Sequence, residues 1–132
     1  MTTTFFLNCV MGNVFSTQTT PSLPNTYYIG LSTTAPSADG SGVNEPSGGS
    51  YARVALTTLS VPEDGVVSNL QDIEFPESTE DWGTVTHFVL YDAANGGHLL
   101  MGDALTKPRT IQSENQLRFK AGTLKFSLRE SA

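Results

Sequence analysis

The sequence is poor in cysteine, in basic residues and in long apolar runs. Its 132 residues include one cysteine, Cys9, so no disulfide can form within the chain. A lone cysteine in an apolar segment is typical of a small buried side chain rather than of a nucleophile. Only 7 Lys and Arg residues stand against 13 Asp and Glu residues, which gives a net charge of −6. Nucleic acids and anionic membranes are bound by clustered basic residues, so this balance argues against both as partners.

The N-terminal apolar segment, MTTTFFLNCVMGNVF, resembles neither a signal peptide nor a membrane span. No basic residue precedes it, and Asn8, Gly12 and Asn13 interrupt it. A signal peptide needs a basic start and an unbroken apolar core, and a spanning helix needs about 20 apolar residues. We therefore expect a cytosolic chain that is not cleaved.

The same segment has the spacing of a short helix. Phe6, Val10 and Val14 are four residues apart, so they share one face of a helix. Thr3 or Thr4 could cap its N-terminus. We predict an N-terminal helix within residues 3–15.

The densest apolar stretch predicts a central β-hairpin. Phe88-Val89-Leu90-Tyr91 and Leu99-Leu100-Met101 flank Asn95-Gly96, a pair that favours two-residue hairpin turns. Such a turn would place Tyr91 opposite Leu100 and Val89 opposite Gly102. The first strand is apolar on both faces, which indicates a strand in the middle of a sheet that is covered on both sides.

Turn clusters separate the remaining strand patterns, and Pro108 is expected to break the chain behind the hairpin. Residues 35–50 are rich in Gly, Ser and Pro and have little to bury, which predicts an exposed loop that stays mobile unless a neighbouring subunit holds it. Strands are expected at 27–31, 51–56, 73–75, 116–120 and 123–129. With the hairpin they predict six to eight strands.

These patterns predict one domain over residues 1–132, with a β domain over 26–130 behind the helix. The fold class is mainly β: an antiparallel β-sandwich or a jelly-roll-like domain with a short N-terminal α-helix.

Candidate metal ligands are few. His87 and His98 would lie on adjacent strands near Asp92 or Asp103, but zinc generally needs three or four convergent ligands and the sequence has no His/Cys cluster. We expect structural or surface histidines, with no metal and no cofactor.

Catalytic patterns are equally weak. Serine, histidine and aspartate occur without a nucleophile elbow. Gly40–Gly49 lacks the ending and the following helix of a phosphate-binding loop. Five acids could serve as glycosidase carboxylates or as calcium ligands, but their place in a proline-flanked segment favours solvation. They are Asp72, Glu74, Glu77, Glu80 and Asp81. We predict that the chain is not an enzyme and has no catalytic residues.

Two features could serve binding. Trp82 could stack on a sugar, with Tyr51 and the Gly/Ser loop nearby, although a core tryptophan is the simpler interpretation. The C-terminal strands carry basic residues that could face acidic patches between subunits, or simply face water. These residues are Arg118, Lys120, Lys125 and Arg129.

The sequence carries an ordered string of motifs: Tyr28-Ile29-Gly30-Leu31-Ser32-Thr33-Thr34-Ala35-Pro36, Gly48-Gly49-Ser50-Tyr51-Ala52-Arg53-Val54, Phe75-Pro76, Trp82-Gly83-Thr84-Val85-Thr86-His87-Phe88, Tyr91-Asp92-Ala93 and Gly96-Gly97. This string resembles a family of small structural proteins of tailed bacteriophages, often labelled tail-fibre-like. The resemblance covers about residues 5–128. It implies a compact β domain that self-associates or docks on the particle, and it carries no catalytic residues.

The resulting hypothesis is a non-enzymatic, tail-associated virion component (fibre, collar or adaptor) whose partners are its own copies and other virion proteins. It would assemble in the host cytoplasm. The alternatives are a capsid decoration protein and a receptor-binding or carbohydrate-binding module for a host surface glycan. An enzyme such as a wall hydrolase is the third class, for which the sequence offers no site.

Overall fold

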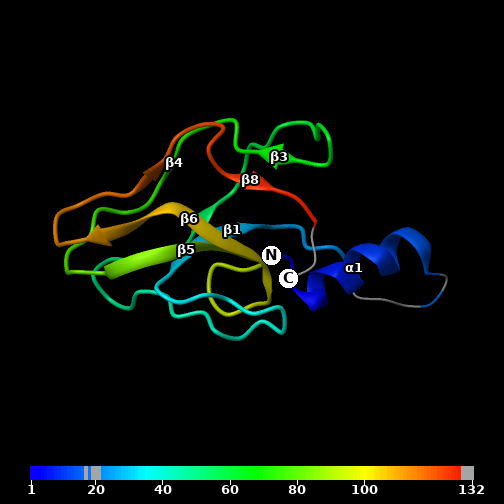
Figure 1. The fold of residues 1–132 in the computed structure, drawn as a ribbon, viewed down its shortest axis with the longest axis horizontal. Coiled ribbons are helices and arrows are strands. Elements are labelled where there is room, and N and C mark those ends of the chain that lie inside the picture. Colours follow the sequence, from blue (N-terminus) through cyan, green and yellow to red (C-terminus); the bar gives the residue numbers. More distant parts are fainter. Residues whose placement is uncertain (17, 19–21, 129–132) are drawn as a thin grey trace.

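The structure, a computed structural model, describes residues 1–16, 18 and 22–128. It is mainly β, with antiparallel sheets and one N-terminal helix, as the sequence predicts. Figure 1 shows the helix α1 extending away from the strands, with the N-terminus near the middle of the molecule.

Helix α1 spans Thr4–Phe15. Thr3 is its N-cap: the hydroxyl of Thr3 accepts a hydrogen bond from the Phe6 backbone N–H at 3.3 Å, which satisfies one of the free donors of the first turn. Phe6 and Cys9 are buried against the sheets. The prediction of a helix in this segment is confirmed, and Thr3 rather than Thr4 caps it.

The main sheet has four strands in the order β2-β1-β5-β6. They are β1 (Tyr28–Ser32), β2 (Val54–Ala55), β5 (Gly83–Tyr91) and β6 (Leu99–Ile111). The predicted central strand, β5, is flanked by β1 and β6, and Phe88, Val89 and Leu90 are buried in succession. Burial of consecutive residues means that both faces of the sheet are covered.

Two smaller sheets pair distant segments: β3 (Val67–Ser68) with β8 (Lys125–Phe126), and β4 (Ile73–Glu74) with β7 (Arg118–Phe119). They cover one face of the main sheet, so the arrangement is sandwich-like (Figure 1). The rings of Phe88 and Phe126 meet edge to face at 5.9 Å across this core. The sequence did not predict β3. The other short strands contain fewer residues than their sequence patterns suggested.

The prediction that Pro108 breaks the chain is wrong, because β6 runs through it to Ile111. Val85 pairs with Arg109 and His87 with Ala104, so residues 105–108 of β6 lie opposite Thr86 alone. This is a β-bulge on the last strand of the sheet, and Pro108 lies inside it. Proline has no N–H to donate, which is tolerated at a bulge of an edge strand.

The hairpin register is half right. Val89 lies opposite Gly102 as predicted, but Tyr91 lies opposite Leu99, not Leu100. The loop comprises residues 92–98 rather than a two-residue Asn95-Gly96 turn. The Asp92 carboxylate closes it by accepting the His98 backbone N–H at 2.7 Å, a local bond that competes with a tight turn.

The loop at residues 35–50 covers the second face of the main sheet. Most of its residues are exposed, but Pro46 is buried and the Glu45 side chain is only 19% exposed. A side chain added at Gly30 would meet Glu45 at 2.8 Å, and one at Gly102 would meet Pro36 at 2.7 Å. Contacts within the chain therefore hold this loop, which its composition did not indicate.

Candidate functional site

The end of α1 exposes a row of apolar side chains. Met11, Val14 and Phe15 are 54%, 62% and 72% exposed. Val14 continues the helix row of Phe6 and Val10, whose side chains line an apolar groove. Together, the exposed end of α1 and this groove form what we call the apolar surface.

The groove lies between α1 and the strands, and its volume is about 310 Å³. Its walls also include Tyr27, Leu56, Leu59 and Val67. Exposed apolar patches rimmed by polar residues are typical of sites where proteins interact. The helical periodicity was visible in the sequence, but the exposure of its last turn was not.

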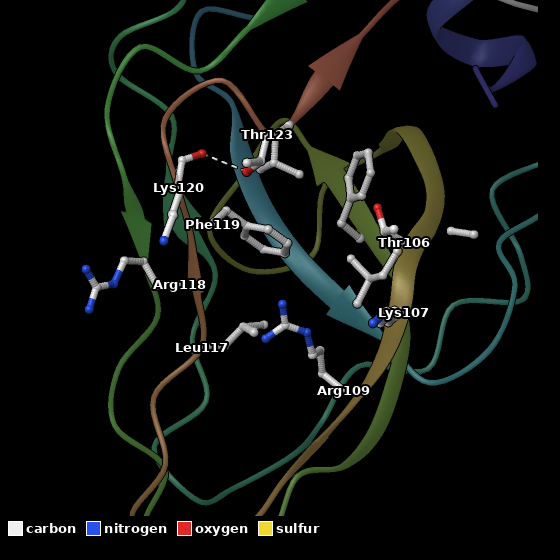
Figure 2. Close-up of a pocket in the computed structure, with 12 residues that line it drawn as sticks. Thr106, Lys107, Arg109, Leu117, Arg118, Phe119, Lys120 and Thr123 are labelled. Atoms are coloured by element: carbon white, nitrogen blue, oxygen red, sulfur yellow. Dashed lines mark hydrogen bonds between the residues drawn. The ribbon is translucent and has the colours of Figure 1, made fainter.

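A second hollow, the basic pocket, lies between the bulge of β6 and the chain from β7 to β8. Figure 2 shows this pocket, whose volume is about 550 Å³. Lys107, Arg109, Arg118 and Lys120 are among the residues that line it. Arg118 and Lys120 were singled out from the sequence. Lys107 and Arg109 were missed, because only the bulge brings them to the same place.

Not every basic residue of the C-terminal strands belongs to this pocket. Lys125 is exposed and does not line it. Arg129 lies outside the described residues. Arg118 pairs with acids of the same chain, at 3.7 Å from Asp72 and 3.6 Å from Glu74. The proposed match of basic and acidic patches is thus partly satisfied within one chain.

The proposed histidine and aspartate ligands do not converge. The Asp92 carboxylate lies 3.0 Å from the His98 ring nitrogen Nδ1, and the His98 ring stacks on Phe5. His87 lies on β5 with its Nδ1 2.7 Å from the Thr86 hydroxyl. In the part of the chain that the structure describes, no three His, Cys, Asp or Glu side chains are placed to hold a metal ion.

Two of these groups have shifted pKa values. Partial burial disfavours the charged form of Asp92, but hydrogen bonds from the His98 backbone and ring outweigh it, and the pKa of Asp92 lies below its usual value. Burial lowers the pKa of His87, while the negative charge of Asp103 acts in the opposite direction. Asp103 itself accepts a hydrogen bond from the Met1 nitrogen at 2.8 Å.

The acidic residues 72–81 have separate structural roles. Asp72 accepts the Ala121 backbone N–H at 2.9 Å, and Asp81 accepts that of Ser113 at 2.9 Å. Glu77 and Glu80 are exposed to solvent. Within the described residues no three of these carboxylates are grouped so that they could hold a metal ion.

Trp82 lies in the core. It is 5% exposed, and its indole nitrogen donates to the Gly49 carbonyl at 2.9 Å. Its ring meets Tyr51 edge to face at 5.3 Å. A buried ring cannot stack on a sugar from solvent, so Trp82 offers no binding platform. Cys9 is 1% exposed, and burial raises the pKa of its thiol.

Among the described residues, no helix combines the length and the apolar character needed to span a membrane.

The mainly β fold and the string of motifs define a small structural protein of tailed bacteriophages. The family whose model matches is described as "Podophage GP4 fiber I protein gp80", and the match covers residues 3–127. The chain therefore belongs to this family, whose description is that of a phage fibre structural protein. A search of curated proteins found no match.

Proposed function

We propose that this chain is a non-enzymatic component of a phage tail fibre that self-associates and docks on other virion proteins through its apolar surface. The observation that carries the proposal is the exposed end of α1, where Val14 and Phe15 are 62% and 72% exposed. The family description supports a fibre role over a capsid role.

The exposed apolar end of α1 favours an oligomer over a monomer. Burying one large apolar side chain contributes about 1.5–3 kcal/mol of favourable free energy. A partner that covers the end of α1 would therefore be bound more tightly for each side chain that it buries. The groove beside the helix offers an apolar recess of about 310 Å³. A symmetric contact between copies would cover both elements at once.

Light scattering coupled to size-exclusion chromatography tests self-association. We expect the wild-type chain to elute as a defined oligomer. The double variant Val14→Gln, Phe15→Gln should elute as a monomer with an unchanged circular-dichroism spectrum, because both side chains are exposed and their replacement leaves the fold of the monomer intact. Leu70→Gln is the matched control, since Leu70 is 54% exposed and does not line the groove. A monomeric wild type, or an oligomer that persists in the double variant, would contradict the proposal.

Electron microscopy of labelled particles tests the location. Antibodies against the chain should decorate the fibres. Label on the head would favour capsid decoration instead, and an unlabelled virion would contradict both. Release of fragments from host cell walls would contradict the non-enzymatic part.

A further inference from the structure

The basic pocket gathers four of the seven Lys and Arg residues of an otherwise acidic chain. One wall is the bulge of β6, which supplies Lys107 and Arg109, and the other is the segment from β7 to β8, which supplies Arg118 and Lys120. A bulge changes the direction of the side chains beside it. It brings Lys107 and Arg109 of the main sheet to the same pocket as Arg118 and Lys120 of the segment from β7 to β8.

The four basic side chains differ in whether nearby carboxylates neutralise their charge. Arg118 has Asp72 and Glu74 at 3.7 and 3.6 Å. Among the described residues, the side chains of Lys107, Arg109 and Lys120 form no ion pair or hydrogen bond. Because like charges around one hollow repel each other, an anion bound between them is stabilised by all three.

The pocket also has an apolar floor. Leu117 and Leu124 are buried beneath it, and Phe119 is half-buried at its side. Figure 2 shows the ring of Phe119 and the guanidinium of Arg109 pointing into the pocket, whereas the guanidinium of Arg118 points outward. An aromatic ring beside basic groups suits a ligand that has both an apolar face and a negative charge.

We propose that this pocket binds a saccharide unit that carries a carboxylate or a phosphate group. Arg109 and Lys107 would hold the anionic group, Lys120 would add its positive charge at the rim, and Phe119 would contact the C–H face of the ring. The volume of about 550 Å³ falls within the usual range of small-ligand sites.

The charge of the whole chain separates this ligand from a nucleic acid. A long polyanion needs a basic surface along many phosphates, and the net charge of −6 opposes one. A single anionic sugar needs only the local field of the pocket. The proposal does not depend on self-association through α1.

NMR titration of the full ¹⁵N-labelled chain tests the proposal. The probes are glucuronate, glucose 6-phosphate, neutral glucose, inorganic phosphate and a single-stranded oligonucleotide. We expect shifts at Arg109, Phe119 and Lys120 with a dissociation constant in the range of about 1 mM for one or both anionic sugars. Binding of glucuronate alone identifies a carboxylate ligand, and binding of glucose 6-phosphate alone identifies a phosphate ligand.

Charge-removing variants identify the site. Lys107→Gln with Arg109→Gln should weaken binding of the anionic sugar by about tenfold or more, since charge-assisted hydrogen bonds are lost. Both residues are exposed, so the fold should persist, and the spectrum of the variant reports on it directly. Lys125→Gln removes one positive charge away from the pocket and should change the affinity by less than about twofold.

Four results would overturn the proposal. They are no shift with either anionic sugar, equal weakening by Lys125→Gln, binding of inorganic phosphate or neutral glucose as tight as that of the anionic sugars, and tighter binding of the oligonucleotide at the same residues.

Discussion

Arg53 and Glu45 form a largely buried ion pair that fastens the loop at residues 35–50 to the main sheet. The Arg53 Nη2 lies 2.6 Å from the Glu45 Oε1, and the Arg53 Nε lies 3.1 Å from the Glu45 Oε2. The Arg53 Nη1 donates to the carbonyls of Ala93 and Gly96, each at 2.8 Å. One guanidinium thus connects the loop at 35–50 with the hairpin loop at 92–98.

Tyr51 completes this cluster. Its hydroxyl donates to the Glu45 Oε2 at 2.5 Å and accepts the Leu31 backbone N–H at 2.9 Å. Burial and the hydrogen bond to Glu45 raise the pKa of Tyr51 far above its usual value, so the hydroxyl stays a donor over the whole range in which the protein is handled. The guanidinium of Arg53 also lies over the Tyr91 ring, 3.6 Å from its centre.

We expect Arg53→Met to lower the free energy of unfolding by about 3 kcal/mol or more, because it leaves the Glu45 carboxylate without its cation in a largely buried site. Urea unfolding measures this change. Arg118→Met is the control: Arg118 is 51% exposed, and its pairs should contribute less than about 1 kcal/mol. Equal losses in the two variants would show that the Arg53 pair is no more important than a surface pair.

Gly30→Ala should destabilise the protein by about 1–3 kcal/mol, as overpacking of a filled site does. The added Cβ would lie 2.8 Å from both the Glu45 carboxylate and the Tyr51 hydroxyl. Tyr51→Phe removes one of these obstacles, so the two substitutions should be non-additive in a double-mutant cycle measured by urea unfolding. If the two changes in the free energy of unfolding simply add, the Tyr51 hydroxyl is not the source of the strain caused by Gly30→Ala.

Gly96→Val should cost about 1 kcal/mol or more, because Gly96 has φ of +63° and a β-branched residue is strained there. A Cβ at this position meets no atom within 4 Å, so the cost comes from the backbone alone. Asn95→Ala is the comparison: Asn95 does not have a positive φ, and its replacement should change the free energy of unfolding by less than about 0.5 kcal/mol. An unchanged denaturation midpoint for Gly96→Val would contradict this loop geometry.

The free energy of unfolding should fall as the pH decreases from 7 to 5, and His87 should account for part of the fall. Burial lowers its pKa in the folded state, so the unfolded chain takes up a proton first, near the ordinary value of about 6.5. The stabilisation is complete above that pH and is lost as the pH falls through the lower folded-state pKa. His87→Gln should flatten this dependence in melting curves recorded from pH 7 to 5. If the stability of the variant and of the wild type depends on pH in the same way, His87 does not contribute to the pH dependence.

The sequence by itself determined the local elements. Apolar spacing in α1 and apolar density in β5 report directly on periodicity and burial, so the helix, the central strand and the mainly β class were predictable. The alternation around Leu117 and Leu124 likewise predicted two short strands with apolar rows inward. Motif order pointed to the phage structural family, which the family match confirms.

The tertiary structure decided how these elements meet. Pro108 stays in a strand only because that strand lies at an edge and bulges there, and no local rule identifies an edge. The contact of Glu45 with Arg53 joins two separate segments, and the pocket lined by Arg109 and Lys120 joins two more that are distant in the chain. Their side chains carry the same charge and chemistry wherever they lie, so only the packing of the sheets decides which of them become neighbours.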